Sequence, residues 1–323
     1  MITTASTAPS FWNTRSAARH HGSESHRWSA LLEGFVLRTA RLGLLLPLAA
    51  ASAVATISLL ATGSLSLWAA FAAALCVYSS YLIDHLAEVD TFEDGLASDR
   101  SKLLAASRRR TAGFGAAAYL LALGIAGWQS GLSAFLMLLS FPLAVVIYCT
   151  PVIPRRTAGK WSMIRLKEIP GLKAVYTAAF WGWLMSFALV FHHTGSWGEH
   201  AGFAGFMFLA LLVNTVFCDF KDLERDRAEG VPTLPLTLGA APTFRLLMGV
   251  SLAAAIWLVL SIALNWLPTT AVALLSTRIY ATFLLVGGKS GQLDLGHIGE
   301  AWADFEFVLW LPSVLGAAAF SAL

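Results

Sequence analysis

Residues 201–226 read AGFAGFMFLALLVNTVFCDFKDLERD, in which an apolar run from Ala201 to Cys218 is followed at once by three carboxylates, Asp219, Asp222 and Asp226. An α-helix needs about 20 apolar residues to cross a hydrocarbon core about 30 Å thick, and this run is close to that length. Charged side chains at the end of such a helix are costly to desolvate, so they indicate a site with a function. The stretch therefore predicts a membrane helix that ends in an acidic site.

The remainder of the chain has the same apolar character. Of its 323 residues, 57% are hydrophobic and 13% are charged, and the mean hydropathy is +0.67, whereas soluble proteins carry about 25% charged residues. The apolar runs are Phe35–Ala61, Leu65–Ile83, Phe114–Trp128, Leu132–Tyr148, Leu172–Phe191, Ala201–Cys218, Leu246–Leu264, Thr269–Val286 and Ala301–Ala322. We expect an all-α, polytopic membrane protein with about nine transmembrane helices, surrounded by membrane lipid.

The chain is expected to have two parts. Residues 1–30 are rich in Ser, Thr, His and Arg and lack the apolar stretch of a signal peptide, so they are interpreted as a polar N-terminal tail. Residues 31–323 contain all of the apolar runs and are interpreted as one membrane domain.

Lys and Arg residues occupy every second loop between the apolar runs. The alternate loops, such as His192–His200 and Asn265–Thr269, contain neither residue type. Cytoplasmic loops carry the excess of Lys and Arg in membrane proteins, so the N-terminus and the acidic site are expected at the cytoplasmic face of the cytoplasmic membrane. The net charge of +3 then reflects this topology, and no nucleic-acid partner is expected.

A second group of carboxylates, the pair Asp84 and Glu88, follows the run Leu65–Ile83. Its members are four residues apart, and Asp219, Asp222 and Asp226 follow one another at intervals of three and four, so each set lies on one helix face. Like charges on one face repel, and a bound Mg²⁺ ion, which prefers carboxylate oxygens and keeps waters or phosphate oxygens as further ligands, would compensate. The alternative is a solvated acidic loop held by neighbouring arginines.

Basic residues lie at the same membrane face as the carboxylates. Arg165, Lys167 and Lys173 stand at the start of the fifth run, and Arg100 and Lys102 follow the first acidic pair. A diphosphate would satisfy both groups, because its oxygens bridge metal ions while Lys and Arg neutralise the remaining charge. Each single cation also has the simpler interpretation of a topology signal.

The run DFKDLERDRAEGVPTLP, residues 219–235, resembles the second aspartate-rich motif of the UbiA superfamily of intramembrane prenyltransferases. The segments Tyr148-Cys-Thr-Pro151, RLKEIPGLK (residues 165–173) and Trp181-Gly-Trp183 look like the fourth loop and fifth helix of that superfamily. The resemblance covers nearly all of residues 35–323.

This resemblance implies a nine-helix bundle around a central cavity, in which two Mg²⁺ ions hold a prenyl diphosphate and the prenyl group passes to an aromatic or other lipophilic acceptor. The residues that it implies as metal ligands are Asp84, Glu88, Asp219, Asp222 and Asp226. The residues that it implies at the reaction itself are Asp84, Asp222, Lys167, which stands where the superfamily has a diphosphate-binding lysine, and Tyr148, which stands where it has a cavity tyrosine. The further candidates for contact with the diphosphate are Lys173, Arg165 and Arg100.

The first acidic motif (Ser80, Asp84 and Glu88) departs from the superfamily pattern Asn-x-x-x-Asp-x-x-x-Asp. This departure keeps a second function open, a terpene cyclase of the same superfamily that ionises farnesyl or geranylgeranyl diphosphate and needs no acceptor. A transporter or channel is disfavoured, because the carboxylates lie at one face rather than near the membrane midplane.

Two further features concern the interior of the bundle. Phe180, Trp181 and Trp183 lie deep enough in the fifth run to line a cavity, but helical spacing lets only one or two of them face inward. Aromatic faces there would stabilise an allylic cation. Arg278 falls in the middle of the eighth run, where it is either a functional residue or a side chain that snorkels to the interface.

Overall fold

The computed structural model describes residues 24–91, 99–157 and 160–321. Contacts divide the chain after Phe35 into two units, 1–35 and 36–323. Of the first unit, the structure describes the beginning of helix α1 (Glu24–Arg41), whereas residues 1–23 of the expected polar tail lie outside the described residues. The unit 36–323 contains the predicted membrane domain and is described below.

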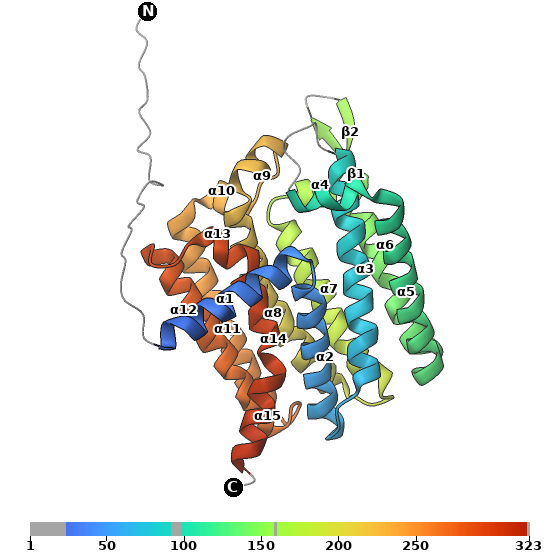
Figure 1. Cartoon of the computed structure of the whole chain (residues 1–323), viewed down its shortest axis with the longest axis vertical. Coiled ribbons are helices and arrows are strands. Elements are labelled where there is room, and N and C mark those ends of the chain that lie inside the picture. The colour runs from blue at the N-terminus through green and yellow to red at the C-terminus, as the bar shows by residue number, and fades with distance from the viewer. Residues whose placement is uncertain (1–23, 92–98, 158–159, 322–323) are drawn as a thin grey trace, which may run out of the picture. The chain divides into compact units, whose positions relative to one another are not determined.

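Helices account for most of this unit (Figure 1). The α-helices are α2 (Leu45–Thr62), α3 (Leu67–Thr91), α4 (Asp99–Ala106), α5 (Arg108–Ser130), α6 (Leu132–Cys149), α7 (Leu172–Phe191), α8 (Trp197–Lys221), α9 (Leu223–Glu229), α10 (Leu234–Leu238), α11 (Ala240–Ala263), α12 (Leu275–Ser290), α13 (Leu295–His297), α14 (Ala303–Val308) and α15 (Trp310–Ser321). The remaining elements are the strands β1 (Pro151–Thr157) and β2 (Lys160–Arg165), the 3₁₀ helices η1 (Leu166–Glu168) and η2 (Thr269–Leu274), and the π-helical turn η3 (Ile298–Trp302).

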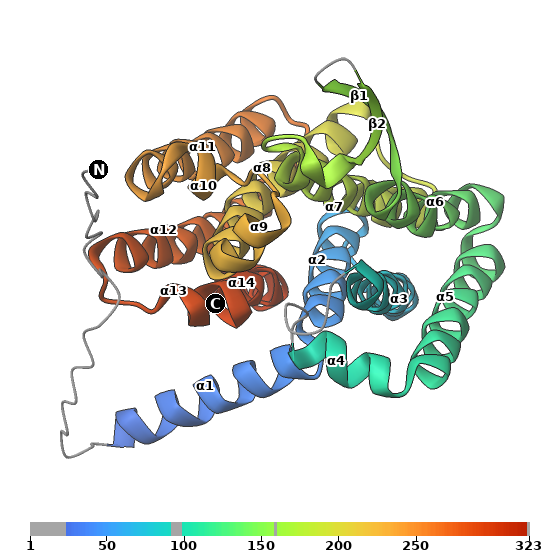
Figure 2. The same ribbon diagram turned by 90° about the horizontal axis from the view of Figure 1, so that it is seen from above.

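Within the described residues, eight segments are long and apolar enough to span a membrane, and α6 is a shorter apolar helix that makes a ninth candidate. The prediction of an all-helical, multi-pass membrane protein with about nine spans is therefore confirmed. Seen from above, α7 packs along α8, α2 lies between α3 and α14, and α3 packs along α5 (Figure 2).

Large buried side chains fill the interior of the bundle where these helices cross. Phe187, Phe203, Phe206 and Trp310 are among the largest side chains that are fully buried. Gly182 of α7 lies so close to α8 that a Cβ atom there would come within 2.9 Å of the carbonyl oxygen of Ala204. Small residues at helix contacts allow this close approach, which is the usual way in which membrane helices gain packing energy.

The first predicted span, Phe35–Ala61, is interrupted in the structure. Helix α1 ends at Arg41 and α2 begins at Leu45. Between them Gly43 has φ +70°, and the ring of Tyr81 lies so close that a Cβ atom at Gly43 would come within 2.5 Å of it. Glycine tolerates this left-handed conformation, so it ends the helix inside an apolar run that hydropathy alone does not divide.

The basic loop between the fourth and fifth spans contains an antiparallel hairpin, which was not predicted from the sequence. Strand β1 pairs with β2 from Pro151 opposite Arg165 to Thr157 opposite Lys160, and η1 then connects β2 to α7. The hairpin therefore stands at the end of the bundle where α3 and α8 end and α7 begins. We call this end, which carries both acidic motifs, the motif end.

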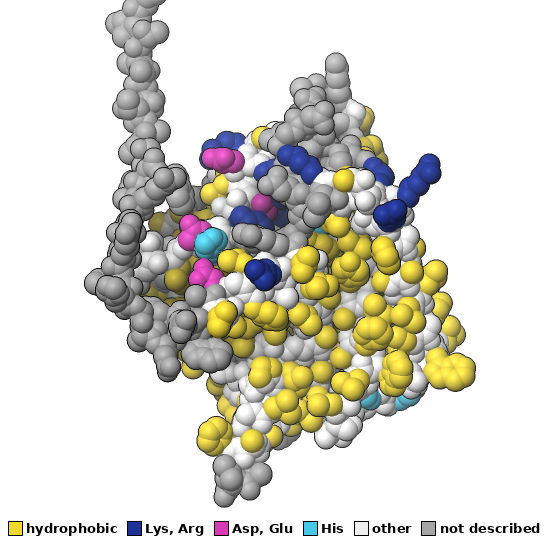
Figure 3. All heavy atoms as spheres, in the orientation of Figure 1, with side chains coloured by type: hydrophobic (Ala, Val, Ile, Leu, Met, Phe, Trp, Pro, Cys, Tyr) yellow, Lys and Arg dark blue, Asp and Glu magenta, His cyan; other side chains and the backbone are white. Residues whose placement is uncertain are grey.

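Side chains of opposite character separate along the bundle. On the face shown in Figure 3, most of the coloured Lys, Arg, Asp and Glu side chains gather toward the motif end, and hydrophobic side chains cover the flank beyond it. This separation is what a spanning bundle requires, because its flank contacts lipid and its ends contact water.

Candidate active site

A cavity of about 300 Å³ lies between α2, α3, α6 and α7. Asp84 and Lys173 line it at the motif end, and Phe141 and Leu184 line it deeper in the bundle. From Lys173 to Leu184 the helix α7 rises about 16 Å, at about 1.5 Å per residue. The cavity therefore joins a charged mouth to an apolar interior about half as deep as the hydrocarbon core.

One face of α7 forms a wall of this cavity. Its lining residues repeat at intervals of three and four along the helix, as one face of an α-helix requires, and they are Lys173, Tyr176, Thr177, Phe180, Trp181 and Leu184. Trp183 is excluded from this face, because its side chain is 48% exposed and its Nε1 donates to Ser140 Oγ at 3.1 Å. The expectation that only one or two of the three aromatic residues face inward is confirmed.

Two cavity residues on this face, Tyr176 and Thr177, were not predicted from the sequence. The signal that identifies them is their distance of three and four residues from Lys173. Tyr176 is fixed in place, because its hydroxyl donates to the carbonyl oxygen of Ala144 at 2.8 Å and its ring stacks on that of Tyr148 with centroids 5.6 Å apart. Tyr148, the predicted cavity tyrosine, also lines the cavity.

The first acidic motif enters the cavity from α3. Ser80 and Asp84, four residues apart on that helix, both line it. The Ser80 hydroxyl donates to the carbonyl oxygen of Cys76 at 3.0 Å, a bond that uses its proton and not the lone pairs of its oxygen. Glu88 lies in the last turns of α3, but its side chain is outside the described part of the chain.

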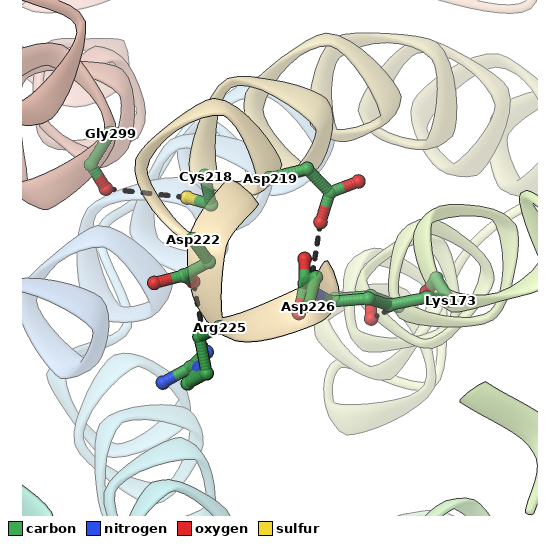
Figure 4. A network of polar contacts seen from close by, with 8 residues as sticks. Lys173, Cys218, Asp219, Asp222, Arg225, Asp226 and Gly299 are labelled. Atoms are coloured by element: carbon green, nitrogen blue, oxygen red, sulfur yellow. Dashed lines mark hydrogen bonds and ion pairs between the residues drawn. The ribbon is translucent and has the colours of Figure 1, made fainter. Parts of the chain in front are cut away.

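The second acidic motif meets α7 at the same end (Figure 4). Lys173 Nζ lies 2.7 Å from Oδ1 of Asp219 and 3.4 Å from Oδ2 of Asp226. Both carboxylates are almost fully buried, with side chains 2% and 4% exposed, whereas the lysine side chain is 19% exposed. Because Lys173 also lines the cavity, its ammonium group connects the second motif to the cavity mouth.

The turn between α8 and α9 brings Asp226 back toward Asp219. Asp222 follows the last residue of α8, and its carbonyl oxygen accepts the N–H of Asp226 at 2.8 Å. Helix α9 is then followed by Gly230, with φ +68°. Asp222 itself is turned to Arg225, with Oδ2 3.0 Å from Nη2, so the three predicted ligands of this motif do not all point to one place.

The environment of Asp226 disfavours its charged form. Burial raises the pKa of this carboxyl group, and the neighbouring charge of Lys173 acts in the opposite direction. A buried carboxylate loses hydration that only a nearby cation replaces. The second motif thus depends on a positive charge, whether that charge belongs to a lysine or to a metal ion.

The other predicted basic residues are placed differently. Arg165 pairs through Nε with Oε1 of Glu168 at 2.6 Å, at the junction of β2 and η1, and it is absent from the described lining of the cavity. The side chains of Lys167 and Arg100 lie outside the described part of the chain. The roles that the sequence predicts for these three residues stay predictions.

The donors of the second motif fit a hard cation such as Mg²⁺. Carboxylate oxygens are its preferred protein ligands, and Oδ1 of Asp219 is a buried oxygen that Lys173 Nζ contacts at 2.7 Å. Among the described residues, no three His, Cys, Asp or Glu side chains are already gathered around one point. Mg²⁺ does not require such a cage, because it commonly takes one or two carboxylates and keeps waters or phosphates.

A buried ion pair lies outside the cavity. Arg278 of α12 pairs with Glu306 of α14, and both side chains are almost fully buried. The guanidinium carbon of Arg278 also lies 5.6 Å from the ring centroid of Phe206. Arg278 therefore does not snorkel to the interface, and its charge is compensated within the bundle.

The fold and the site together define a class of protein: a multi-pass helical membrane protein with a cavity that is charged at its mouth and aromatic inside. A sequence comparison with protein families assigns residues 44–294 to the UbiA prenyltransferase family. The chain belongs to the UbiA prenyltransferase family. No curated protein sequence matches the chain.

Solved structures have the same fold. A UbiA homologue from Aeropyrum pernix is 14% identical with a TM-score of 0.61, over 87% of this chain and 98% of that one. A UbiA homologue from Archaeoglobus fulgidus, solved with DMAPP and Mg²⁺, is 16% identical with a TM-score of 0.58, over 87% and 99% of the two chains. A structure described as a digeranylgeranylglyceryl phosphate synthase is 15% identical with a TM-score of 0.55, over 86% and 99%.

Proposed function

We propose that this protein is an Mg²⁺-dependent intramembrane prenyltransferase, which ionises a prenyl diphosphate and transfers the prenyl group to an aromatic or other lipophilic acceptor. The observation that carries the proposal is the cavity itself. It joins Asp84 and Lys173 at its mouth to Phe180 and Trp181 in its interior, and a prenyl diphosphate has the same two ends, a polyanion and an apolar chain.

The charged residues at the mouth suit the diphosphate end. Lys173 contributes a point charge that reaches the cavity, and Asp84 contributes a carboxylate that lines it. Asp219 and Asp226 contact Lys173 and Asp222 contacts Arg225, so these three carboxylates would supply further oxygens next to the mouth. Bound Mg²⁺ would supply positive charge that stabilises the diphosphate as a leaving group. Arg165, Lys167 and Arg100 are proposed as further diphosphate partners, and Glu88 as a further metal ligand, on the basis of the sequence motifs.

The interior suits the prenyl chain and its cation. Phe141, Tyr176, Phe180 and Trp181 surround the cavity, and the rings of Phe141 and Phe180 meet edge to face with centroids 5.8 Å apart. Aromatic faces stabilise a desolvated cation by up to about 2 kcal/mol each. Tyr148, at the mouth, is positioned between the diphosphate end and this interior.

The motif end is proposed to face the cytoplasm. The segments of the sequence that carry the basic residues, namely the hairpin and the regions of α4 and α9, are at this end, and the coloured Lys and Arg side chains gather there in Figure 3. The loops at the other end contain no Lys or Arg between His192 and His200 or between Asn265 and Thr269. This distribution follows the positive-inside rule. A water-soluble diphosphate would then reach the cavity from the cytoplasm.

Product analysis of the purified protein tests the proposal. The protein is incubated in lipid nanodiscs with Mg²⁺ and geranyl, farnesyl or geranylgeranyl diphosphate, with and without membrane extract as a source of acceptors. Mass spectrometry should detect a prenylated product that disappears in Asp84→Ala and Asp222→Ala but persists in Glu224→Gln, whose exposed side chain lies in the same motif. Unchanged turnover in both alanine variants would contradict the proposal.

A terpene cyclase of the same family is the second candidate. The aromatic lining favours it, because the rings that stabilise a transferred cation would equally guide a cation that attacks its own double bonds. The same incubation separates the two functions: a cyclic hydrocarbon or alcohol formed from farnesyl or geranylgeranyl diphosphate without any extract identifies cyclisation, and a product that requires extract identifies transfer.

A further inference from the structure

Lys173 stands between the second acidic motif and the cavity. Its ammonium group contacts Asp219 and Asp226 at once, at 2.7 Å and 3.4 Å, and its side chain also lines the cavity mouth. The two carboxylates lie at the tip of its side chain (Figure 4), and neither is among the residues that line the cavity. A cation that approaches these carboxylates from the cavity therefore meets Lys173 first.

The two carboxylates need this lysine when no metal is present. Each is almost fully buried, and a buried charge is costly unless a partner of opposite charge compensates it. Within the described residues, Lys173 is the cation that pairs with both of them, whereas Asp222 has Arg225. A lysine ammonium is a compact point charge on a flexible stem with three donors, so it can both fill such a position and leave it.

We propose that Lys173 is a resident counter-ion that occupies the place of a metal ion at Asp219 and Asp226, and that it leaves these carboxylates for the diphosphate when metal and diphosphate bind together. This inference rests on the proposed function. In this proposal Lys173 contacts the diphosphate, and it is also a positioning residue that couples the binding of the metal ion to the binding of the diphosphate.

The arrangement makes metal and diphosphate depend on each other. A metal ion alone must displace an ammonium group that then has no anion to bind, so it binds weakly. A diphosphate at the cavity mouth offers the displaced ammonium a new partner, so the two ligands bind together. Such coupling is reciprocal and typically changes each affinity by about 5- to 150-fold. It would keep the carboxylates from holding a metal ion before a substrate arrives.

Metal binding, rather than turnover, tests the inference. Mn²⁺ prefers the same oxygen ligands as Mg²⁺, and the free ion is counted by electron paramagnetic resonance. In the unaltered protein, inorganic diphosphate should tighten Mn²⁺ binding by a factor of about 5 to 150. In Lys173→Met, Mn²⁺ alone should bind roughly tenfold tighter or more, and the effect of diphosphate should shrink by a similar factor.

Two variants serve as controls. Lys173→Arg keeps the positive charge, so it should keep weak binding of Mn²⁺ alone. Lys221→Met removes one positive charge from the end of the same helix that carries Asp219, but its side chain is exposed, so it should bind Mn²⁺ as the unaltered protein does. Tighter Mn²⁺ binding in both methionine variants would mean a general loss of positive charge and would overturn the inference.

Thermal unfolding gives a second measurement. Without metal, Lys173→Met should unfold at a lower temperature than the unaltered protein, and Mn²⁺ should restore the loss, because either cation can compensate Asp219 and Asp226. If Lys173 had only a structural role, the unfolding temperature would fall in Lys173→Met and Mn²⁺ would not restore it. If Lys173→Met does not fold, Lys173→Gln, which keeps a donor but no charge, carries the same expectations.

The outcomes for the inference and for the proposed function are separate. Prenyl product from the unaltered protein, together with unchanged or weaker Mn²⁺ binding in Lys173→Met, would overturn the inference and leave the function in place. The expected Mn²⁺ results without any product from a prenyl diphosphate would support the inference and contradict the function.

Discussion

Phe180 is a residue whose role depends on which face of α7 it occupies. It lines the cavity, and its ring lies within 4.8 Å of that of Tyr176 and 5.8 Å of that of Phe141, centroid to centroid. These three rings form an aromatic group that begins at Tyr176, about one helical turn from Lys173, and reaches Phe180, about two turns away. A cation formed when diphosphate leaves would therefore develop beside them.

Replacement of Phe180 by Leu should slow ionisation of the substrate. The loss of one cation–π contact of about 1 to 2 kcal/mol corresponds to a decrease in kcat of roughly 5- to 30-fold. The measurement is the rate of diphosphate release at saturating substrate. Phe283→Leu, at an exposed position on α12, is the matched control and should keep the original rate; an equal decrease in both variants would contradict a role in catalysis.

At the residue level, the sequence predicted which residues form the acidic site better than it predicted which side chains these residues contact. The spacing of Asp219, Asp222 and Asp226 identified an acidic site, but it did not show that Asp222 turns to Arg225 while the other two share Lys173. Partner choice depends on how closely α7 approaches α8 and α9, and this distance is set by tertiary packing. Tyr176 and Thr177 share one face of α7 with Lys173, but the sequence alone does not show that this face borders a cavity.

The approach of helix α7 to helix α8 depends on Gly182. A Cβ atom at this position would come within 2.9 Å of the carbonyl oxygen of Ala204, which is backbone and cannot move aside as a side chain would. Gly182→Ala should therefore separate the two helices and reduce stability by about 1 to 3 kcal/mol, as overpacking usually does. Thermal unfolding in detergent measures the loss.

Gly249→Ala is the control for this prediction. Gly249 lies in helix α11, and a Cβ atom there would meet no other atom within 4 Å, so alanine should be neutral or stabilising through its better helix propensity. Because α7 carries Lys173 and α8 carries Asp219, Gly182→Ala should also lower activity. Equal stability of the two variants would contradict the proposed close contact.

Helices α12 and α14 are joined by the pair Arg278 and Glu306. Removal of one charge leaves the other buried without compensation, so Glu306→Gln should cost about 3 to 5 kcal/mol of stability. The double variant Arg278→Met with Glu306→Leu should recover much of that loss, because apolar pairs of similar size often replace buried ion pairs without a penalty. Unfolding of the single and double variants under identical conditions measures both effects, and additive losses would contradict the pairing.

At the element level, the spans were predicted well and their interruptions poorly. Apolar length indicates which segments can cross the membrane, and among the described residues eight segments are long and apolar enough, with α6 as a ninth candidate. The break at Gly43 depends on the contact with Tyr81, which lies on another helix. The hairpin formed by β1 and β2 was not predicted because its Pro and Arg residues are typical of a polar loop, although Val152, Ile153 and Trp161 favour strands.

For the whole molecule, the orientation of the bundle gives a direct test. Single cysteines are introduced at Glu224, at the motif end, and at Trp197, at the other end; both side chains are exposed. In intact cells an impermeant thiol reagent should label Trp197→Cys, and it should label Glu224→Cys only after the membrane is opened. The unaltered protein gives the background from its own cysteines, and the reverse pattern would contradict a cytoplasmic active site.

The fold of the whole molecule could be predicted from the sequence because a small number of strong physical constraints govern membrane proteins. Backbone groups in lipid must be paired internally, so apolar runs become helices, and the loops with Lys and Arg are the basis of the proposed orientation. The position of the cavity did not follow in the same way. It lies between α2, α3, α6 and α7, and only the packed structure shows that the second motif reaches it through Lys173.

The pairing of Arg278 with Glu306 also constrains how the protein is made. A lone Arg or Asp at the centre of an inserting helix costs about 2.5 to 3.5 kcal/mol during membrane integration, and Arg278 leaves the ribosome before its partner does. Insertion of helix α12 therefore carries a free-energy cost, which is removed when α14 inserts and Glu306 pairs with Arg278. We therefore expect α12 and α14 to insert into the membrane together. A nascent chain that ends before Glu306 should leave Arg278 unpaired and should be degraded as a misfolded protein.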